Sequence, residues 1–138
     1  MTLSPNASLL RHPAFAHLTE TGRLALEDGV RFLRFRPGQQ LTDARVLPSQ
    51  VLLIMQGQAR VLVRDRGRPT TLEKLGPGAV VGLASLLRTA ACEDASASSE
   101  LVAAALPDGL VLDLYASETG FRQWCSTTLW AAELHALT

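Results

Sequence analysis

The sequence predicts a mainly β domain with flanking helices, of the α+β class, in which the strands form a sandwich or roll. Two observations lead to this prediction. Between Val30 and Tyr115, short apolar runs are separated by Gly/Pro turns such as Pro37-Gly38 and Gly76-Pro77-Gly78, a pattern typical of all-β sandwiches and rolls. On either side of this region, apolar residues recur at helical spacing. The length of 138 residues suits one domain.

Residues 1–29 are expected to form one or two short helices. Pro13 begins or breaks a helix, Thr19 can cap a helix over Glu20–Glu27, and Gly29 marks its end. We expect these helices to lie against another part of the chain, because one face is apolar. The apolar residues at helical spacing are Leu9, Leu10, Phe15, Leu18, Leu24 and Leu26.

Residues 30–115 are expected to form the roll. Val51–Met55 is apolar throughout, as in a strand that is buried on both faces. In the segment Ala59–Arg64, Ala59, Val61 and Val63 would face one side and Arg60 and Arg64 the other, which predicts a strand. Asp65–Arg68 then forms a hairpin turn into a strand over Thr70–Leu75.

Three segments of the roll carry weaker signals. Val30–Phe35 alternates imperfectly, so its strand register stays open. Leu110, Leu112 and Leu114 alternate around Asp113 and predict a further strand. Ala90–Ser99 is rich in Ala and Ser and is expected to be a loop.

Residues 116–138 return to a helical pattern. Ser117 can cap a segment that holds Phe121 and Trp124, and Thr127 can cap another that holds Trp130. These aromatic residues could anchor a protein partner, because tryptophan is enriched at interface hot spots. Packing of both tryptophans onto the roll is an equally open interpretation, and so is a homodimer.

Charge and hydropathy exclude several functions. Thirteen basic residues balance thirteen acidic ones, which argues against nucleic-acid binding because phosphate neutralisation draws on excess Lys and Arg. No apolar run approaches the ~20 residues of a membrane helix, and the N-terminus lacks the apolar region of a signal peptide. We therefore expect a cytoplasmic protein that makes no membrane contact through this segment.

Catalytic and metal chemistry lack suitable residues. Cys92 and Cys125 are far apart, and His12, His17 and His135 lie near the termini. This spacing fits neither a zinc site nor a nucleophile–base pair. No Gly-x-Ser-x-Gly or phosphate-binding P-loop occurs. We predict no metal site, no catalytic residue and no enzymatic activity.

Three segments, in order, resemble the cyclic nucleotide-binding domain family. Phe35–Leu41 is similar to that family's opening strand and turn, and Leu53–Val61 resembles its "YLIxxGxVxV" strand–turn–strand. Leu75–Leu87 resembles the approach to its phosphate-binding cassette, "LGPGDxFGELALL". The resemblance runs from about Phe35 to Leu114 and implies a cupin-like double-stranded β-roll (a jelly roll), with a short cassette helix near residues 82–88.

The resemblance also implies a ligand site. In the family, helix N–H groups and an arginine hold the cyclic phosphate, and a glutamate accepts from the ribose. Carried over, Gly82 matches the family's glycine, while Leu83 stands at the glutamate position and Ala84-Ser85 continue the short helix. In our alignment, the family's Pro-Arg-x-Ala motif, which contains that arginine, falls on Ser98-Ser99-Glu100-Leu101.

The arginine is therefore missing, and the ligand set that remains is weak. Arg88 could substitute for the arginine, and Ser85, Ser98 and Ser99 could assist the backbone. The alternative is a tight turn that fills the roll with leucines, in which Arg88 is a solvated charge at a helix end. We leave both open.

These departures predict a regulatory or binding module that does not bind cAMP or cGMP tightly. Hydrogen bonds to charged groups contribute roughly 1.5–3 kcal/mol each, so losing both groups costs on the order of 3–6 kcal/mol. At about 1.4 kcal/mol per tenfold, a micromolar site becomes millimolar or weaker. We therefore expect no cofactor, although cAMP or cGMP stays a candidate ligand.

Two alternatives remain. One is a sensor of another small ligand, which would rely less on phosphate contacts. The other rests on the segment from Phe121 to Leu134, which is similar to the region joining such a domain to a peptide- or toxin-secreting ABC transporter. In that case the chain would be the transporter's N-terminal regulatory domain.

Overall fold

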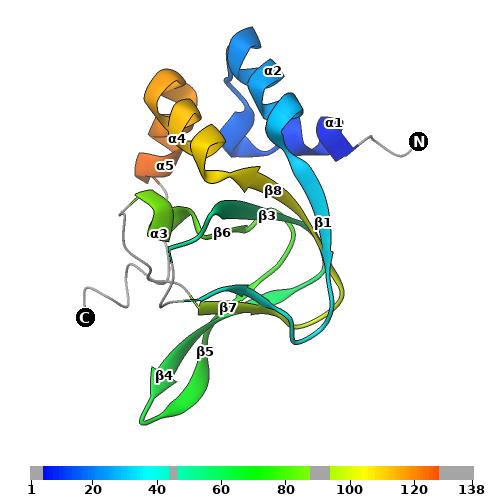
Figure 1. Cartoon of the computed structure of the whole chain (residues 1–138), viewed down its shortest axis with the longest axis vertical. Helices are drawn as coiled ribbons and strands as arrows, with labels where there is room; N and C mark the ends of the chain where they lie inside the picture. Colours follow the sequence, from blue (N-terminus) through cyan, green and yellow to red (C-terminus); the bar gives the residue numbers. More distant parts are fainter. Residues whose placement is uncertain (1–4, 44–46, 88–93, 128–138) are drawn as a thin grey trace.

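The computed structural model describes residues 5–43, 47–87 and 94–127. Two helices and a short 3-10 helix come first, eight strands with one short helix among them follow, and two helices close the described part (Figure 1). The helices are α1 (Pro5–Leu10), η1 (Pro13–Phe15), α2 (Glu20–Gly29), α3 (Leu83–Leu87), α4 (Asp108–Ser117) and α5 (Thr119–Thr127). The strands are β1 (Arg31–Phe35), β2 (Gln40–Thr42), β3 (Gln50–Gln56), β4 (Ala59–Asp65), β5 (Arg68–Leu75), β6 (Val80–Val81), β7 (Asp94–Ala97) and β8 (Leu101–Pro107).

The strands form two four-stranded antiparallel sheets, in the orders β1-β8-β3-β6 and β2-β7-β4-β5. Their facing sides bury one apolar cluster between the sheets, so the predicted β-roll with flanking helices is confirmed. The buried members of this cluster are Leu52, Ile54, Ala59, Val81, Ala95, Ala97, Leu101, Ala103 and Ala105.

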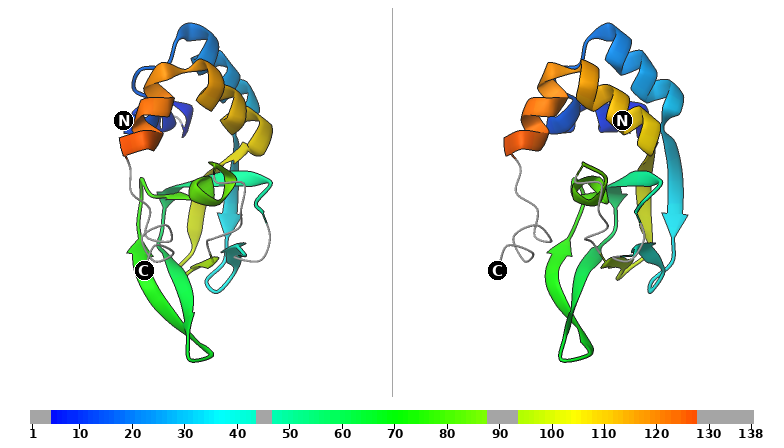
Figure 2. Two further views of the ribbon diagram at one scale, coloured as in Figure 1. Left: turned by 90° about the vertical axis from the view of Figure 1, so that its left-hand side faces the viewer. Right: turned by 60° about the vertical axis from the view of Figure 1, so that its left-hand side comes forward.

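The helices form a second layer on the outer side of the first sheet. Figures 1 and 2 show α1, α2, α4 and α5 gathered at one end of the molecule, with the β4–β5 hairpin at the other. Because side chains alternate along a strand, Leu52 and Ile54 of β3 join the cluster between the sheets, while Val51 and Leu53 join the cluster beneath the helices. This arrangement confirms the prediction that Val51–Met55 is a strand covered on both faces.

Two local predictions are confirmed at the level of single residues. Thr19 is the N-cap of α2, and its Oγ1 accepts a hydrogen bond from the Gly22 N–H at 3.2 Å. The β4–β5 hairpin turns at Arg66 and Gly67, whose φ angles are 53° and 80°. Two successive positive φ angles are those of a type I′ turn, which matches the twist of antiparallel strands.

Two predictions about secondary structure are wrong. Leu110, Leu112 and Leu114 lie in helix α4 and not in a strand. The buried residues of α4 are Val111 and Leu114, three positions apart, whereas Leu112 is 46% exposed. The buried residues of this segment therefore follow the spacing of a helix and not the alternation of a strand.

The second wrong prediction is the loop over Ala90–Ser99, which contains strand β7. Ala95 and Ala97 face the space between the sheets and are almost completely buried. Their small side chains fit there, although alanine gives little sign of a strand in the sequence. In the described parts of the chain, no helix has the length and apolar character needed to cross a bilayer.

Candidate functional site

The segment from β6 into α3 is the cassette region that the sequence singles out. Strand β6 pairs with β3, with Val81 opposite Leu52, and the chain then turns at Gly82 with φ of +92°. A Cβ atom at Gly82 would lie 3.3 Å from the Gln50 carbonyl oxygen and 3.6 Å from Thr42 Cγ2. Glycine is therefore required here both by backbone conformation and by close packing.

Helix α3 begins directly after this turn, and the Leu86 N–H donates to the Gly82 carbonyl at 3.1 Å. Leu83, Ser85 and Leu86 are buried, with exposures of 1%, 2% and 6%. Both leucines belong to the cluster beneath the helices. Apolar packing thus fixes α3 between the roll and the helices, a position that Figure 2 shows.

Leu83 points toward the helices. It lines a small apolar void of about 10 Å³ together with Phe121 of α5 and Trp124, so its side chain is part of the core. The position that we matched to the family's glutamate therefore carries a side chain that neither accepts hydrogen bonds nor faces solvent. The Ala84 side chain and the whole of Arg88 lie outside the described residues.

Ser98 and Ser99 lie far from this segment. The Ser98 N–H donates to the Gln58 carbonyl, and the Gln58 N–H donates to Ser99 Oγ, each at 2.9 Å. Gln58 follows β3 at one end, whereas Gly82 packs on Gln50 at the other. Since a strand rises about 3.3 Å per residue, the two ends of β3 are about 20 Å apart. The structure does not bring these serines to α3.

The same geometry corrects our alignment of the family's arginine. The strand that follows α3 is β7, and Ser98–Leu101 come after it rather than at its start. The alignment failed because β7 gives no recognisable strand signal. The correction supplies no arginine, since the sequence has none between Arg88 and Arg122.

The C-terminal aromatic residues pack inside the molecule. Phe121 of α5 is 3% exposed and stacks on Phe15, with ring centroids 5.9 Å apart. Trp124 is half-buried and meets the His12 ring edge-on at 5.5 Å. Of the three aromatic residues that we considered for a partner interface, these two contact the N-terminal segment, and Trp130 lies outside the described residues.

His12 fastens this helical layer to the roll. Its Nδ1 accepts from the Ala14 N–H at 3.1 Å, so Nε2 carries the proton and donates to the Gly78 carbonyl at 2.8 Å. Gly78 belongs to the turn between β5 and β6, which leads into Gly82 and α3. The helices are therefore joined both to α3 and to the turn before it.

The site offers little reactive chemistry. No group of three His, Cys, Asp or Glu residues suited to a metal occurs among the residues placed by the structure. Burial raises the pKa of the Cys125 thiol to about 11, which keeps it protonated and unreactive near neutrality. Glu118 is buried, but both carboxylate oxygens accept hydrogen bonds from Thr19.

Comparison with known proteins identifies the family to which the chain belongs. A family model described as "Cyclic nucleotide-binding domain" matches residues 32–118, more than half of the chain. None of the curated proteins compared with the chain matches it.

Several solved structures have a similar fold. A putative cyclic nucleotide-binding protein from Geobacter metallireducens is 16% identical, with a TM-score of 0.74 over 99% of this chain and 100% of that one. The Thermus thermophilus catabolite activator protein is 24% identical, with a TM-score of 0.72 over 91% of this chain and 59% of that one.

A regulatory subunit of a cAMP-independent protein kinase A from Trypanosoma brucei is 23% identical, with a TM-score of 0.68 over 87% of this chain. The chain spans about half the length of the trypanosome subunits that it matches, 46–48% of each. At these identities the likeness shows the fold alone.

Proposed function

The chain belongs to the cyclic nucleotide-binding domain family, and we propose that it is a regulatory module of that family whose cassette does not bind cAMP or cGMP tightly. The observation that carries the proposal is the burial of Leu83 at 1% exposure, where the family pattern has a glutamate. An apolar core residue cannot accept a hydrogen bond from a ribose hydroxyl.

Charge supports the same conclusion. Arg88 directly follows α3, and between it and strand β8 the sequence contains Glu93 and Asp94 but no further arginine. A phosphate monoanion next to these carboxylates is repelled, and the charge-assisted hydrogen bonds that the family's arginine would donate from the following strand are missing. Losing the two family groups costs on the order of 3–6 kcal/mol of binding free energy, which moves a micromolar site to millimolar or weaker.

A regulatory role is supported by the way α3 is connected. Leu83 and Phe121 belong to one buried cluster, against which Trp124 packs, and all three line the same small void, so a displacement of α3 changes the surroundings of α5. A small ligand or a protein that displaces α3 would therefore also affect α5, the last helix of the described residues. A sensor of another ligand and an ABC transporter's N-terminal domain stay predictions of the same kind, as do homodimerisation and a cytoplasmic location.

Isothermal titration tests the proposal. The purified chain is titrated with cAMP, cGMP and a cyclic dinucleotide to millimolar concentration, and we expect no saturable binding in the micromolar range. Saturable micromolar binding of cAMP or cGMP would overturn the proposal, because it would require a ligand set other than the family's.

Tryptophan emission gives a second readout. The chain has two tryptophans, so a Trp130→Phe variant leaves Trp124 as the sole reporter of the contact between α3 and α5. Its emission should stay constant as cAMP is added, with 5′-AMP as the matched control ligand. A saturable change with cAMP alone would contradict the proposal.

A further inference from the structure

The outer face of the second sheet carries two adjacent cations that no family motif accounts for. Arg60 of β4 lies directly opposite Lys74 of β5 in the antiparallel register, and both side chains are exposed. Directly opposite residues have Cβ atoms about 5 Å apart, and like charges in such pairs repel. The sheet therefore holds a repulsive pair that an anion would relieve.

No carboxylate of the described residues neutralises this pair. The ion pairs found there join Arg23 to Glu20 and to Glu27, on helix α2. Asp94 lies along β7, but its Oδ1 accepts from Gln40 Nε2 at 2.9 Å. Glu73 precedes Lys74 on β5, and strand alternation directs it to the opposite face.

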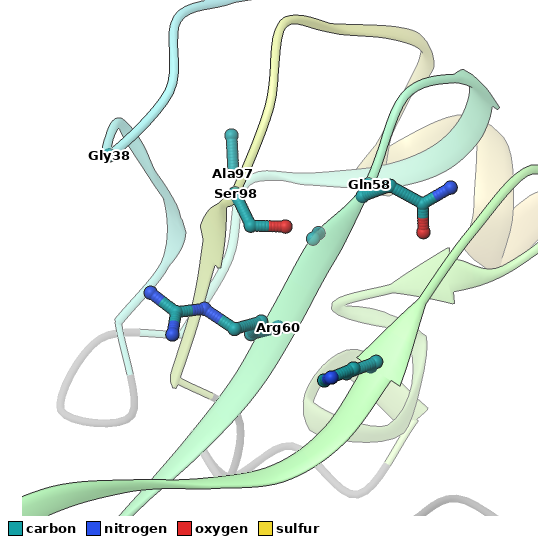
Figure 3. Close-up of a pocket in the computed structure, with 7 residues that line it drawn as sticks. Gly38, Gln58, Arg60, Ala97 and Ser98 are labelled. Atoms are coloured by element: carbon teal, nitrogen blue, oxygen red, sulfur yellow. The ribbon is translucent and has the colours of Figure 1, made fainter.

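The two cations border a cavity of about 520 Å³ at the end of this sheet. Ala59 and Ala97, which pair in register, line it with the turn residue Gly38. Small residues there leave room beside the cations. Ser98 and Gln58 also line the cavity. Figure 3 shows Arg60 extending from β4 across the strand that carries Ala97, with the Ser98 hydroxyl pointing toward β4.

We propose that this cavity binds the phosphoryl group of a phosphate-bearing small molecule. A guanidinium presents paired N–H donors that match two phosphate oxygens, and an ammonium adds a second positive charge. The Ser98 hydroxyl and the Gln58 amide supply further neutral donors. The volume lies within the range of small-molecule sites. This site is separate from α3 and does not depend on the function proposed above.

NMR titration of the ¹⁵N-labelled full chain tests the site. Pyrophosphate and ADP are added separately at constant ionic strength, and we expect saturable shifts of the Ala59, Arg60 and Ser98 amide signals but not of Gly82. Tighter binding of ADP assigns the site to organic phosphates, whereas equal binding assigns it to the bare anion. Added NaCl should weaken both, as for any exposed ionic contact.

Matched variants separate this site from general counterion binding. Arg60→Gln and Lys74→Gln should each weaken binding at least about fivefold, while Arg31→Gln, an equal charge change on the other sheet, should leave it within about twofold. Without phosphate, neither Arg60→Gln nor Lys74→Gln should lower the melting temperature, because each removes a repulsion. No saturable shift, or equal weakening by Arg31→Gln, would overturn the proposal.

Discussion

Replacing Glu118 should remove two short hydrogen bonds that hold the helices of the helical layer to one another. Glu118 is 5% exposed, and its Oε1 and Oε2 accept from the Thr19 N–H and Thr19 Oγ1, each at 2.7 Å. These short, charge-assisted bonds join the junction of α4 and α5 to the N-terminus of α2, where a negative charge also suits the helix dipole.

The magnitude follows from these two bonds. Each contributes roughly 1.5–3 kcal/mol, and the Glu118→Ala variant also leaves the Thr19 N–H without its acceptor. Water entering the truncated site offsets part of that loss, so we expect the free energy of unfolding to fall by roughly 2–4 kcal/mol. Glu118→Gln keeps one acceptor, so its free energy of unfolding should fall by about half as much.

Urea denaturation followed by circular dichroism measures this loss. The control is Glu20→Gln, because the Glu20 side chain is 81% exposed in a 3.7 Å ion pair and should change stability by less than about 0.5 kcal/mol. If Glu118→Ala also costs less than about 1 kcal/mol, the two hydrogen bonds do not hold the helices together and the reasoning fails.

Gly22 provides a coupled test of the same contact. A Cβ atom there would lie 2.5 Å from Glu118 Cδ and 2.6–2.9 Å from its two carboxylate oxygens. Gly22→Ala should therefore destabilise the protein, even though alanine is the better helix former. In the Glu118→Ala background the clash is gone, so the two substitutions should be strongly non-additive.

Three further predictions concern the core near the cassette. Gly82→Ala should lower the free energy of unfolding, measured by urea denaturation, by more than Gly78→Ala does. Both glycines have φ above +90°, where an alanine is strained by about 1–2 kcal/mol, but of the two only Gly82 has neighbours within 4 Å of an added Cβ. Leu83→Ala should lower the free energy of unfolding by about 2–5 kcal/mol, and a loss below about 1 kcal/mol would show that Leu83 is not a core residue. In a Cys92→Ser background, Cys125 should react with a thiol reagent only when the protein unfolds. The difference in free energy of unfolding between the wild type and Cys125→Ala should decrease as pH rises from 9 toward 11, because the thiol ionises at lower pH in the unfolded chain than in the folded one.

The parts of the fold that depend on neighbouring residues could be predicted from the sequence. The Thr19 cap, the Arg66-Gly67 turn and the buried strand Val51–Met55 each depend on interactions within a few residues or on one continuous apolar run. The segment Leu110–Leu114 could not be assigned, because its leucines fit a strand and its Val111–Leu114 spacing fits a helix. Only contact with α2 and the roll shows which residues are buried.

The candidate site needed long-range geometry that the sequence does not contain. Ser98 and Ser99 follow an alanine-rich strand whose pairing with β4 is set by packing between the sheets, so their distance from Gly82 depends on the whole roll. The Arg60–Lys74 pair also required the hairpin register, which includes an irregularity between Val61 and Leu62. A one-residue error there would have placed the two cations on opposite faces.

If the cassette does not bind a cyclic nucleotide, as we propose, its packing explains why the sequence motif is still recognisable. Gly82 is needed because its φ is positive and because Gln50 lies against it. Leu83 is needed because it is part of the buried cluster that also contains Phe121. Both requirements hold whether or not a ligand is bound. The family's groups that bind a cyclic phosphate are charged and are not part of this packing, so a chain without them can keep the fold. The glycine–leucine pattern is therefore evidence for the roll, and the evidence for a ligand has to come from the charges beside it.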